Sequence, residues 1–199
     1  MIKTADAFGW TERCPGDPYE GYAVAMARDL APEQLLERLD AHPADPPRIT
    51  GAEALHRRWM DEWDPDIVVG AFTAGGWTVA FEPSGYLLAD ADVLARLSVG
   101  TRLVAHSNDV NGHDHFHWFQ DGDLRLHVKP FAPEQREGSA ADDLVDAMRA
   151  MGFAFAFAED EGEQRPIAKA FALAEHITGV PLTAETFEEA VYLLGVVED

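Results

Sequence analysis

Residues 67–82 read IVVGAFTAGGWTVAFE, and this stretch indicates the fold class more clearly than any other part of the chain. Its two halves, 67–73 and 77–82, are rich in β-branched and aromatic residues, and Gly75 and Gly76 stand between them. Two such runs joined by a glycine pair are typical of a β-hairpin. The stretch therefore predicts two antiparallel strands at the centre of the chain.

Three more runs downstream have the composition of strands. Residues 101–106, 114–119 and 124–128 are rich in β-branched, aromatic and aliphatic side chains, and the turn residues Asp121 and Gly122 separate the last two. Five strands in hairpin order predict a mainly antiparallel sheet.

Helices are predicted before, within and after this region of the sequence. Apolar residues at helical spacing follow each of several helix-starting residues. These residues are Pro32, Thr50, Asp90, Ser139, Pro166 and Thr183. The prediction is one α+β domain over residues 1–199, with a helical and loop part in 1–65, a five-stranded sheet in 66–130 packed on one face by helices, and a helical C-terminal third in 139–199.

The composition excludes several classes of protein. The chain has 199 residues, and its 36 acidic against 15 basic residues give a net charge of −21. A nucleic-acid binder needs a basic surface to displace counterions from phosphates, so neither nucleic acid nor an anionic membrane is an expected partner. Because 47% of the residues are hydrophobic, the chain is apolar enough to fold.

The sequence also predicts a cytoplasmic location. Residues 1–13 lack the apolar run of a secretory signal, and the longest uncharged stretch, 67–81, is too short to span a membrane. Cys14 is the only cysteine, so no intramolecular disulfide can form, which fits a reducing compartment. No feature of the sequence indicates an oligomeric state.

Several spaced motifs are shared with a known family. They are GGWTVAFEP at 75–83, GTR at 100–102, the stretch 108–122, RLH at 125–127, ALAE at 172–175, TGV at 178–180 and LGVV at 194–197. With these motifs the chain resembles a family of uncharacterised proteins from high-GC Gram-positive bacteria, from Phe8 to the end. The family is catalogued as a domain of unknown function, so the resemblance implies no reaction and no catalytic residues.

A group of histidines is the first candidate site. A three-residue loop before Asp123 would pair that residue with Phe119 and place His115 opposite His127, with His117 on the same face of the sheet. Neighbouring strand positions are close enough for His115, His117 and His127 to share a zinc ion with an open fourth position. The alternative is a solvent-facing strand surface that contains histidines. No cofactor other than this possible zinc is expected.

Acidic residues are the second candidate site. Residues 132–199 contain 15 acidic and 4 basic residues, and the acids there are predicted to bind a basic protein. The residues of this predicted partner-binding set are Glu159, Asp160, Glu161, Glu163, Glu185, Glu188 and Glu189. Glu82, at the end of an apolar strand, can either line a pocket or hydrogen-bond the following turn. The acids of 59–66 fit the solvated side of a helix.

Two main functions are consistent with these features. The first is a non-catalytic interaction protein, of the immunity or inhibitor kind, whose acidic surface binds a basic partner. The second is a small metal-dependent enzyme that uses the histidines. A DNA mimic, in which carboxylates imitate phosphates, is a third. The sequence lacks the phosphate-binding loop, the dinucleotide-binding glycine motif, the nucleophile elbow and the H-E-x-x-H motif.

Overall fold

A computed structural model describes residues 2–12, 21–52, 54–55, 57, 67–109, 111–155 and 165–198. Its strands are β1 (Tyr22–Arg28), β2 (His42–Thr50), β3 (Ile67–Ala74), β4 (Trp77–Glu82), β5 (Arg102–Asn108), β6 (Asp114–Gln120), β7 (Asp123–Lys129), β8 (Ala132–Glu137) and β9 (Val191–Val197). Its helices are η1 (Ala5–Glu12), α1 (Pro32–Arg38), η2 (Leu87–Ala89), α3 (Ala91–Leu97), α4 (Val145–Met151), α5 (Pro166–Thr178) and α6 (Ala184–Glu188).

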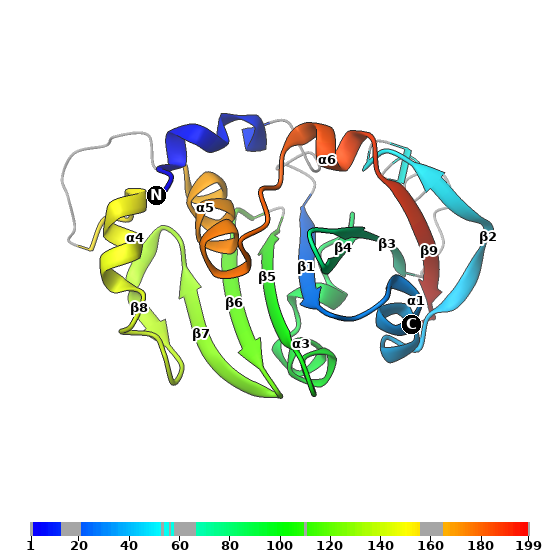
Figure 1. Cartoon of the computed structure of the whole chain (residues 1–199), viewed down its shortest axis with the longest axis horizontal. Helices are drawn as coiled ribbons and strands as arrows, with labels where there is room; N and C mark the ends of the chain where they lie inside the picture. Colours follow the sequence, from blue (N-terminus) through cyan, green and yellow to red (C-terminus); the bar gives the residue numbers. More distant parts are fainter. Residues whose placement is uncertain are drawn as a thin grey trace.

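The strands form one sheet in the order β2-β9-β3-β4-β1-β5-β6-β7-β8, and all the pairs are antiparallel. Figure 1 shows the strands side by side across the molecule, with β2 and β8 at its opposite ends. The α+β class and the antiparallel sheet are confirmed. The five predicted strands are present as β3 to β7, but the prediction of a five-stranded sheet is wrong, because four further strands complete it.

The prediction that helices cover one face is also wrong. On the first face, α4, α5, α6 and η1 pack on large side chains such as Met26, Phe81 and Phe116. On the second face, α1, η2 and α3 pack on small ones such as Ala25, Ala80 and Ala105. The sheet therefore lies between two helical layers, and alanines on its second face let those helices approach closely.

The central strand β1 shows how the sequence encodes this arrangement. Its alternate positions are alanines, including Ala23 and Ala25, and the positions between them hold the larger Tyr22, Val24 and Met26. Large and small side chains thus separate onto the two faces. Because both faces are buried, the polar alternation that marks a half-exposed strand is absent.

The C-terminal third is not wholly helical. Helix α6 ends at Glu188, and the following residues form β9, which pairs with both β2 and β3. Gly195 lets this strand pass close to the end of α1, since a Cβ at this position would lie 2.8 Å from the Cβ of Ala41. The last strand of the described chain is therefore an interior strand of the sheet.

The two edges of the sheet are poorly suited to further pairing. Strand β2 contains Pro43, Pro46 and Pro47, which lack the N–H groups that a neighbouring strand would need. Its pairing with β9 is interrupted between Pro43 and Arg48, and that of β8 with β7 is irregular between His127 and Lys129. Such edges resist the addition of another strand. In the described part of the chain, no helix is long and apolar enough to cross a membrane.

Candidate functional site

The three predicted histidines lie together on the second face of β6 and β7, in a register that differs from the predicted one. His117, not His115, is opposite His127, and Phe119 is opposite Leu124. The predicted three-residue loop is wrong, because the turn contains only two residues and the extra residue, Arg125, forms a bulge in β7. The pairing is displaced by two residues, so the histidines keep the predicted face.

Asp121 is the physical reason for the shorter turn. It has a positive φ of 52°, as does Gly122 with 83°, and two such residues form the tight turn that joins twisted strands. The Asp121 carboxylate accepts a hydrogen bond from the backbone N–H of Gly100 at 2.8 Å. Its own N–H donates to the carbonyl of Thr101 at 2.9 Å. The turn is thus held against the loop before β5.

Two of the three imidazoles, those of His115 and His127, form a hydrogen-bonded row that ends at the Glu137 carboxylate. His127 donates its Nδ1–H to Glu137 Oε1 at 2.9 Å, and its Nε2 shares a hydrogen bond with Nδ1 of His115 at 3.0 Å. The ring of His117 lies parallel to that of His127, at 7° and with the centroids 4.5 Å apart. His115 is the half-exposed end of this row.

The environment lowers the pKa of two of these rings, His117 and His115, and so favours their neutral form. Burial, with smaller contributions from His127 and His115, lowers the pKa of His117 to about 3. Burial also lowers the pKa of His115, and the nearby His127 and Lys129 act in the same direction. A neutral imidazole is the form that binds a metal.

The zinc prediction depends on how these nitrogens point. Among the residues that the structure describes, no three His, Cys, Asp or Glu side chains are arranged to hold a metal ion. The facing nitrogens of His115 and His127 are joined by a hydrogen bond, which would have to open for both to bind one ion. Zinc at His115, His117 and His127 stays a prediction.

The predicted partner-binding acids are described only in part. Glu159, Asp160, Glu161 and Glu163 lie outside the described residues, as do Cys14 and the acids of 59–66. Glu185, Glu188 and Glu189 are exposed on α6 and just after it. Their carboxylates make no hydrogen bond or ion pair with any residue in the described part of the chain.

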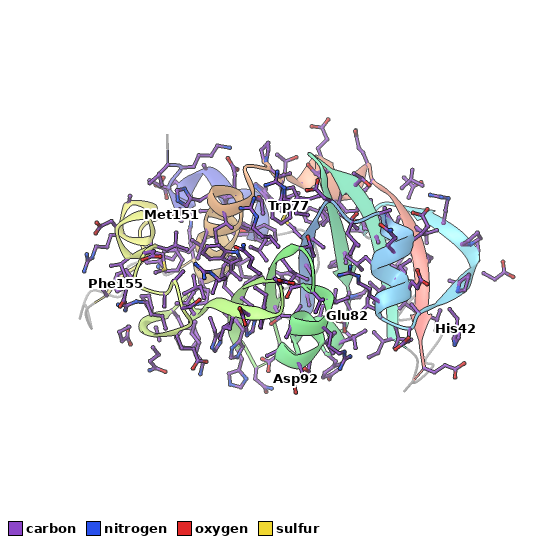
Figure 2. All side chains as sticks on the ribbon, turned by 60° about the horizontal axis from the view of Figure 1, so that its bottom comes forward. His42, Trp77, Glu82, Asp92, Met151 and Phe155 are labelled. Carbon is purple, nitrogen blue, oxygen red and sulfur yellow. The ribbon has the colours of Figure 1, made fainter. Side chains whose placement is uncertain are left out.

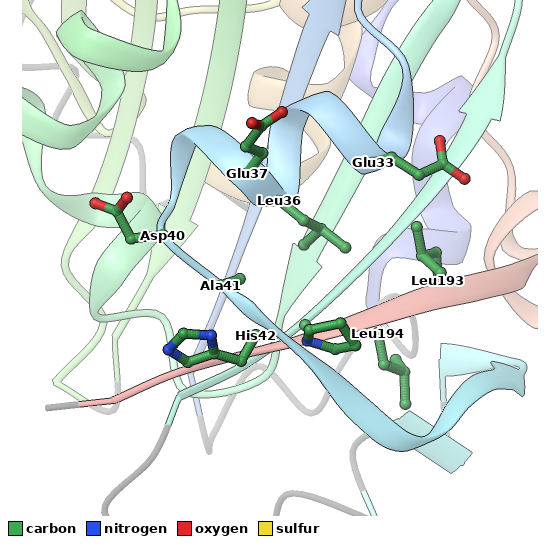
Figure 3. Close-up of a pocket in the computed structure, with 10 residues that line it drawn as sticks. Glu33, Leu36, Glu37, Asp40, Ala41, His42, Leu193 and Leu194 are labelled. Atoms are coloured by element: carbon green, nitrogen blue, oxygen red, sulfur yellow. The ribbon is translucent and has the colours of Figure 1, made fainter.

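A hollow of about 490 Å³, which the sequence did not indicate, lies between α1 and the strands β2 and β9 (Figure 3). It is lined by Glu33, Leu36, Glu37, Asp40, Ala41, His42, Pro43, Leu193, Leu194 and Gly195. Figure 3 shows acidic side chains on and just after α1, with leucines on β9. The acidic hollow, as we call this site, combines an apolar floor with carboxylates from a single helix and its C-terminal end.

The carboxylates of the acidic hollow have no partner among the residues that the structure describes. Glu33, Glu37 and Asp40 are exposed, and none forms an ion pair or side-chain hydrogen bond with another described residue. The only basic residue of α1, Arg38, instead donates to the carbonyls of Leu97 and Val99 at 2.7 and 2.8 Å. The charge at this site is therefore not neutralised by its own helix.

Glu82 does not line a pocket, because it holds the loop that follows β4. Its fully buried carboxylate accepts hydrogen bonds from the backbone N–H groups of Tyr86, Leu87 and Leu88 at 2.7 to 3.1 Å, and from the hydroxyl of Ser84. Figure 2 shows Glu82 within the body of the molecule, away from His42 at its β2 end. Of the two predicted roles, the turn contact is confirmed.

A buried polar network was missed from the sequence. His106 on β5 donates from Nε2 to Asp114 Oδ1 at 2.8 Å, and its Nδ1 shares a hydrogen bond with the hydroxyl of Tyr22 at 3.2 Å. All three side chains are at most 3% exposed. They join β1, β5 and β6 on the first face, and no sequence motif brings them together.

Comparison with known proteins identifies a family but no activity. The model of a family of unknown function, DUF6461, matches residues 1–199. No curated protein and no solved structure matches the chain. The expected resemblance to a family of uncharacterised proteins is thus confirmed.

Proposed function

Because this chain belongs to DUF6461, a family of unknown function, we propose its function from its own surface: it is a non-catalytic protein that binds a basic protein partner. Such a role suits an immunity or inhibitor protein. A cytoplasmic location and a source in high-GC Gram-positive bacteria are parts of the same proposal.

One observation carries the proposal. Exposed carboxylates occur on two separate parts of the surface, around α6 and around α1, and the described basic residues neutralise neither group. With a net charge of −21, the molecule produces a strong negative potential. Such a potential accelerates association with a positively charged partner and disfavours acidic ones.

Electrostatic repulsion among the exposed carboxylates also supports the proposal. Unpaired carboxylates repel one another and lower the stability of the folded chain. A basic partner relieves this repulsion when it binds, and the gain falls as salt screens the charges. Binding that weakens with salt is therefore the expected signature.

The test uses immobilised protein and a lysate, followed by the purified partner. We expect one or more basic proteins to be retained at low salt and released at high salt, and the purified partner to associate at least tenfold faster at low than at high ionic strength. A mutant in which Glu185, Glu188 and Glu189 are replaced by glutamine should associate more slowly. A partner whose association is insensitive to salt would contradict the proposal.

A second candidate function is a metal-dependent enzyme at the histidines, and Glu137 favours it. Metal-binding histidines usually donate their second ring N–H to a carboxylate, as His127 does to Glu137. Under this hypothesis, zinc raises the melting temperature of the wild-type protein and not that of His127→Gln. An unchanged melting temperature of the wild type with added zinc would exclude it.

A further inference from the structure

We infer that the acidic hollow receives an arginine or lysine side chain from the basic partner. This inference rests on the proposed function and deepens it by naming the docking site and the group that fills it. The site is formed by α1 and its C-terminal end on one side, and by β2 and β9 on the other.

The size and the apolar floor of the acidic hollow fit a long side chain that has an aliphatic stem. Its volume of about 490 Å³ is within the range of sites that enclose ligands. Leu36, Pro43 and Leu193 provide apolar contact surface. The methylene stems of arginine and lysine bury well against such surface while their charged ends stay near polar groups.

The carboxylates of α1 supply the negative charge that the charged end of that side chain meets. Glu33, Glu37 and Asp40 are separated by four and three residues, so they follow one stripe along α1 and into the turn after it. Since they have no partner among the described residues, no existing ion pair has to break when a cation binds. Arginine, which can donate to a carboxylate through two N–H groups, fits this arrangement best.

Other occupants fit less well. A partner strand cannot extend the sheet here, because the neighbouring edge strand β2 contains three prolines. A second copy of the chain would bring its own net charge of −21 towards three exposed carboxylates. A basic side chain from a partner can both contact the apolar floor and neutralise the carboxylates.

The experiment measures binding of two labelled peptides of equal length by fluorescence anisotropy. One peptide alternates arginine with leucine, and the other alternates arginine with glycine. We expect the first to bind several-fold more tightly, because it adds apolar contacts to the same charge. This preference should disappear in Leu193→Ser, which makes the floor polar.

Two matched charge variants locate the site. The α1 variant carries Glu33→Gln, Glu37→Gln and Asp40→Asn, and should bind the arginine–leucine peptide about tenfold more weakly than wild type. The control variant removes the same charge near β7 and β8, at the opposite end of the sheet, through Asp123→Asn, Glu134→Gln and Asp143→Asn, and should lose less than threefold. All these substitutions are at exposed positions, and melting temperatures show whether each variant is folded.

The outcomes separate the two proposals. If the control variant weakens peptide binding as much as the α1 variant, the surface acts through its general charge and the inference about the acidic hollow is overturned. The inference is also overturned if the amide chemical shifts of Ala41, Leu193 and Gly195 do not change when the peptide binds. If neither variant nor salt changes the binding of basic peptides, the proposed function itself fails.

Discussion

Replacement of His117 by leucine tests whether this buried histidine makes the protein sensitive to acid. His117 is 6% exposed and neutral, and its pKa in the folded protein is about 3. In the unfolded chain it titrates at its ordinary value of 6.5. Between these two values the unfolded state binds a proton that the folded state does not.

The sign and size of the effect follow from this difference. The stability that depends on the neutral ring is fully present above pH 6.5 and is lost as the pH falls. At pH 7 the two states bind nearly the same number of protons at this site. At pH 5 protonation favours the unfolded state by about 2 kcal/mol relative to pH 7, since each pKa unit corresponds to about 1.4 kcal/mol.

Urea unfolding at pH 7 and pH 5 measures this contribution. The wild type should lose about 2 kcal/mol more of its free energy of unfolding between these two pH values than His117→Leu does. Leucine has a similar volume and does not titrate, so the comparison removes the effects of the remaining carboxyl and imidazole groups. The matched control is His176→Leu, at an exposed position of α5, which should behave like wild type. Equal losses in wild type and His117→Leu would refute the reasoning.

Three further substitutions test the contacts that shape the fold, each by urea unfolding at pH 7. Glu82→Ala should cost about 3 kcal/mol or more, because it leaves buried backbone N–H groups without an acceptor; a loss below about 1 kcal/mol would contradict this role. Asp121→Ala should cost about 1–2 kcal/mol through its positive φ and the lost bond to Gly100, and Asp121→Asn should lose less. Gly195→Ala should cost about 1–3 kcal/mol, because the new Cβ would clash with the Cβ of Ala41. Unchanged stability would show that α1 can shift away from β9 without cost, which contradicts the close packing.

The part of the fold that could be predicted is the part with local signals. Strands β3 to β7 have β-rich composition and turn residues between them, and Asp90 caps α3 as expected through the N–H groups of Asp92 and Val93. The sequences YAVAMAR of β1 and VYLLGVV of β9 have no such pattern, because both of their faces are mostly covered. An apolar run without polar alternation fits a buried helix as well as a strand.

The candidate sites show the same division between local and distant information. The common face of His115, His117 and His127 follows from the two-residue period of strands. This prediction was correct although the register was not, because the register differs by two residues. The bulge at Arg125 could not be predicted, since the turn is fixed by contacts to the loop before β5. The acidic hollow combines residues 33–43 with 193–195, and nothing in either segment indicates that they meet.

The position of β9 sets an order for assembly of the sheet. Strand β2 is made early in synthesis, but among the described strands its one partner is β9, so it has no place in the sheet until residues 191–197 have left the ribosome. Until then β3 presents an open apolar edge, which is a surface prone to aggregation. Pairing over such a sequence distance is slow. The strands from β3 to β8 can fold first around β1, and the final step adds β9 and then β2, which closes the edge and completes the acidic hollow.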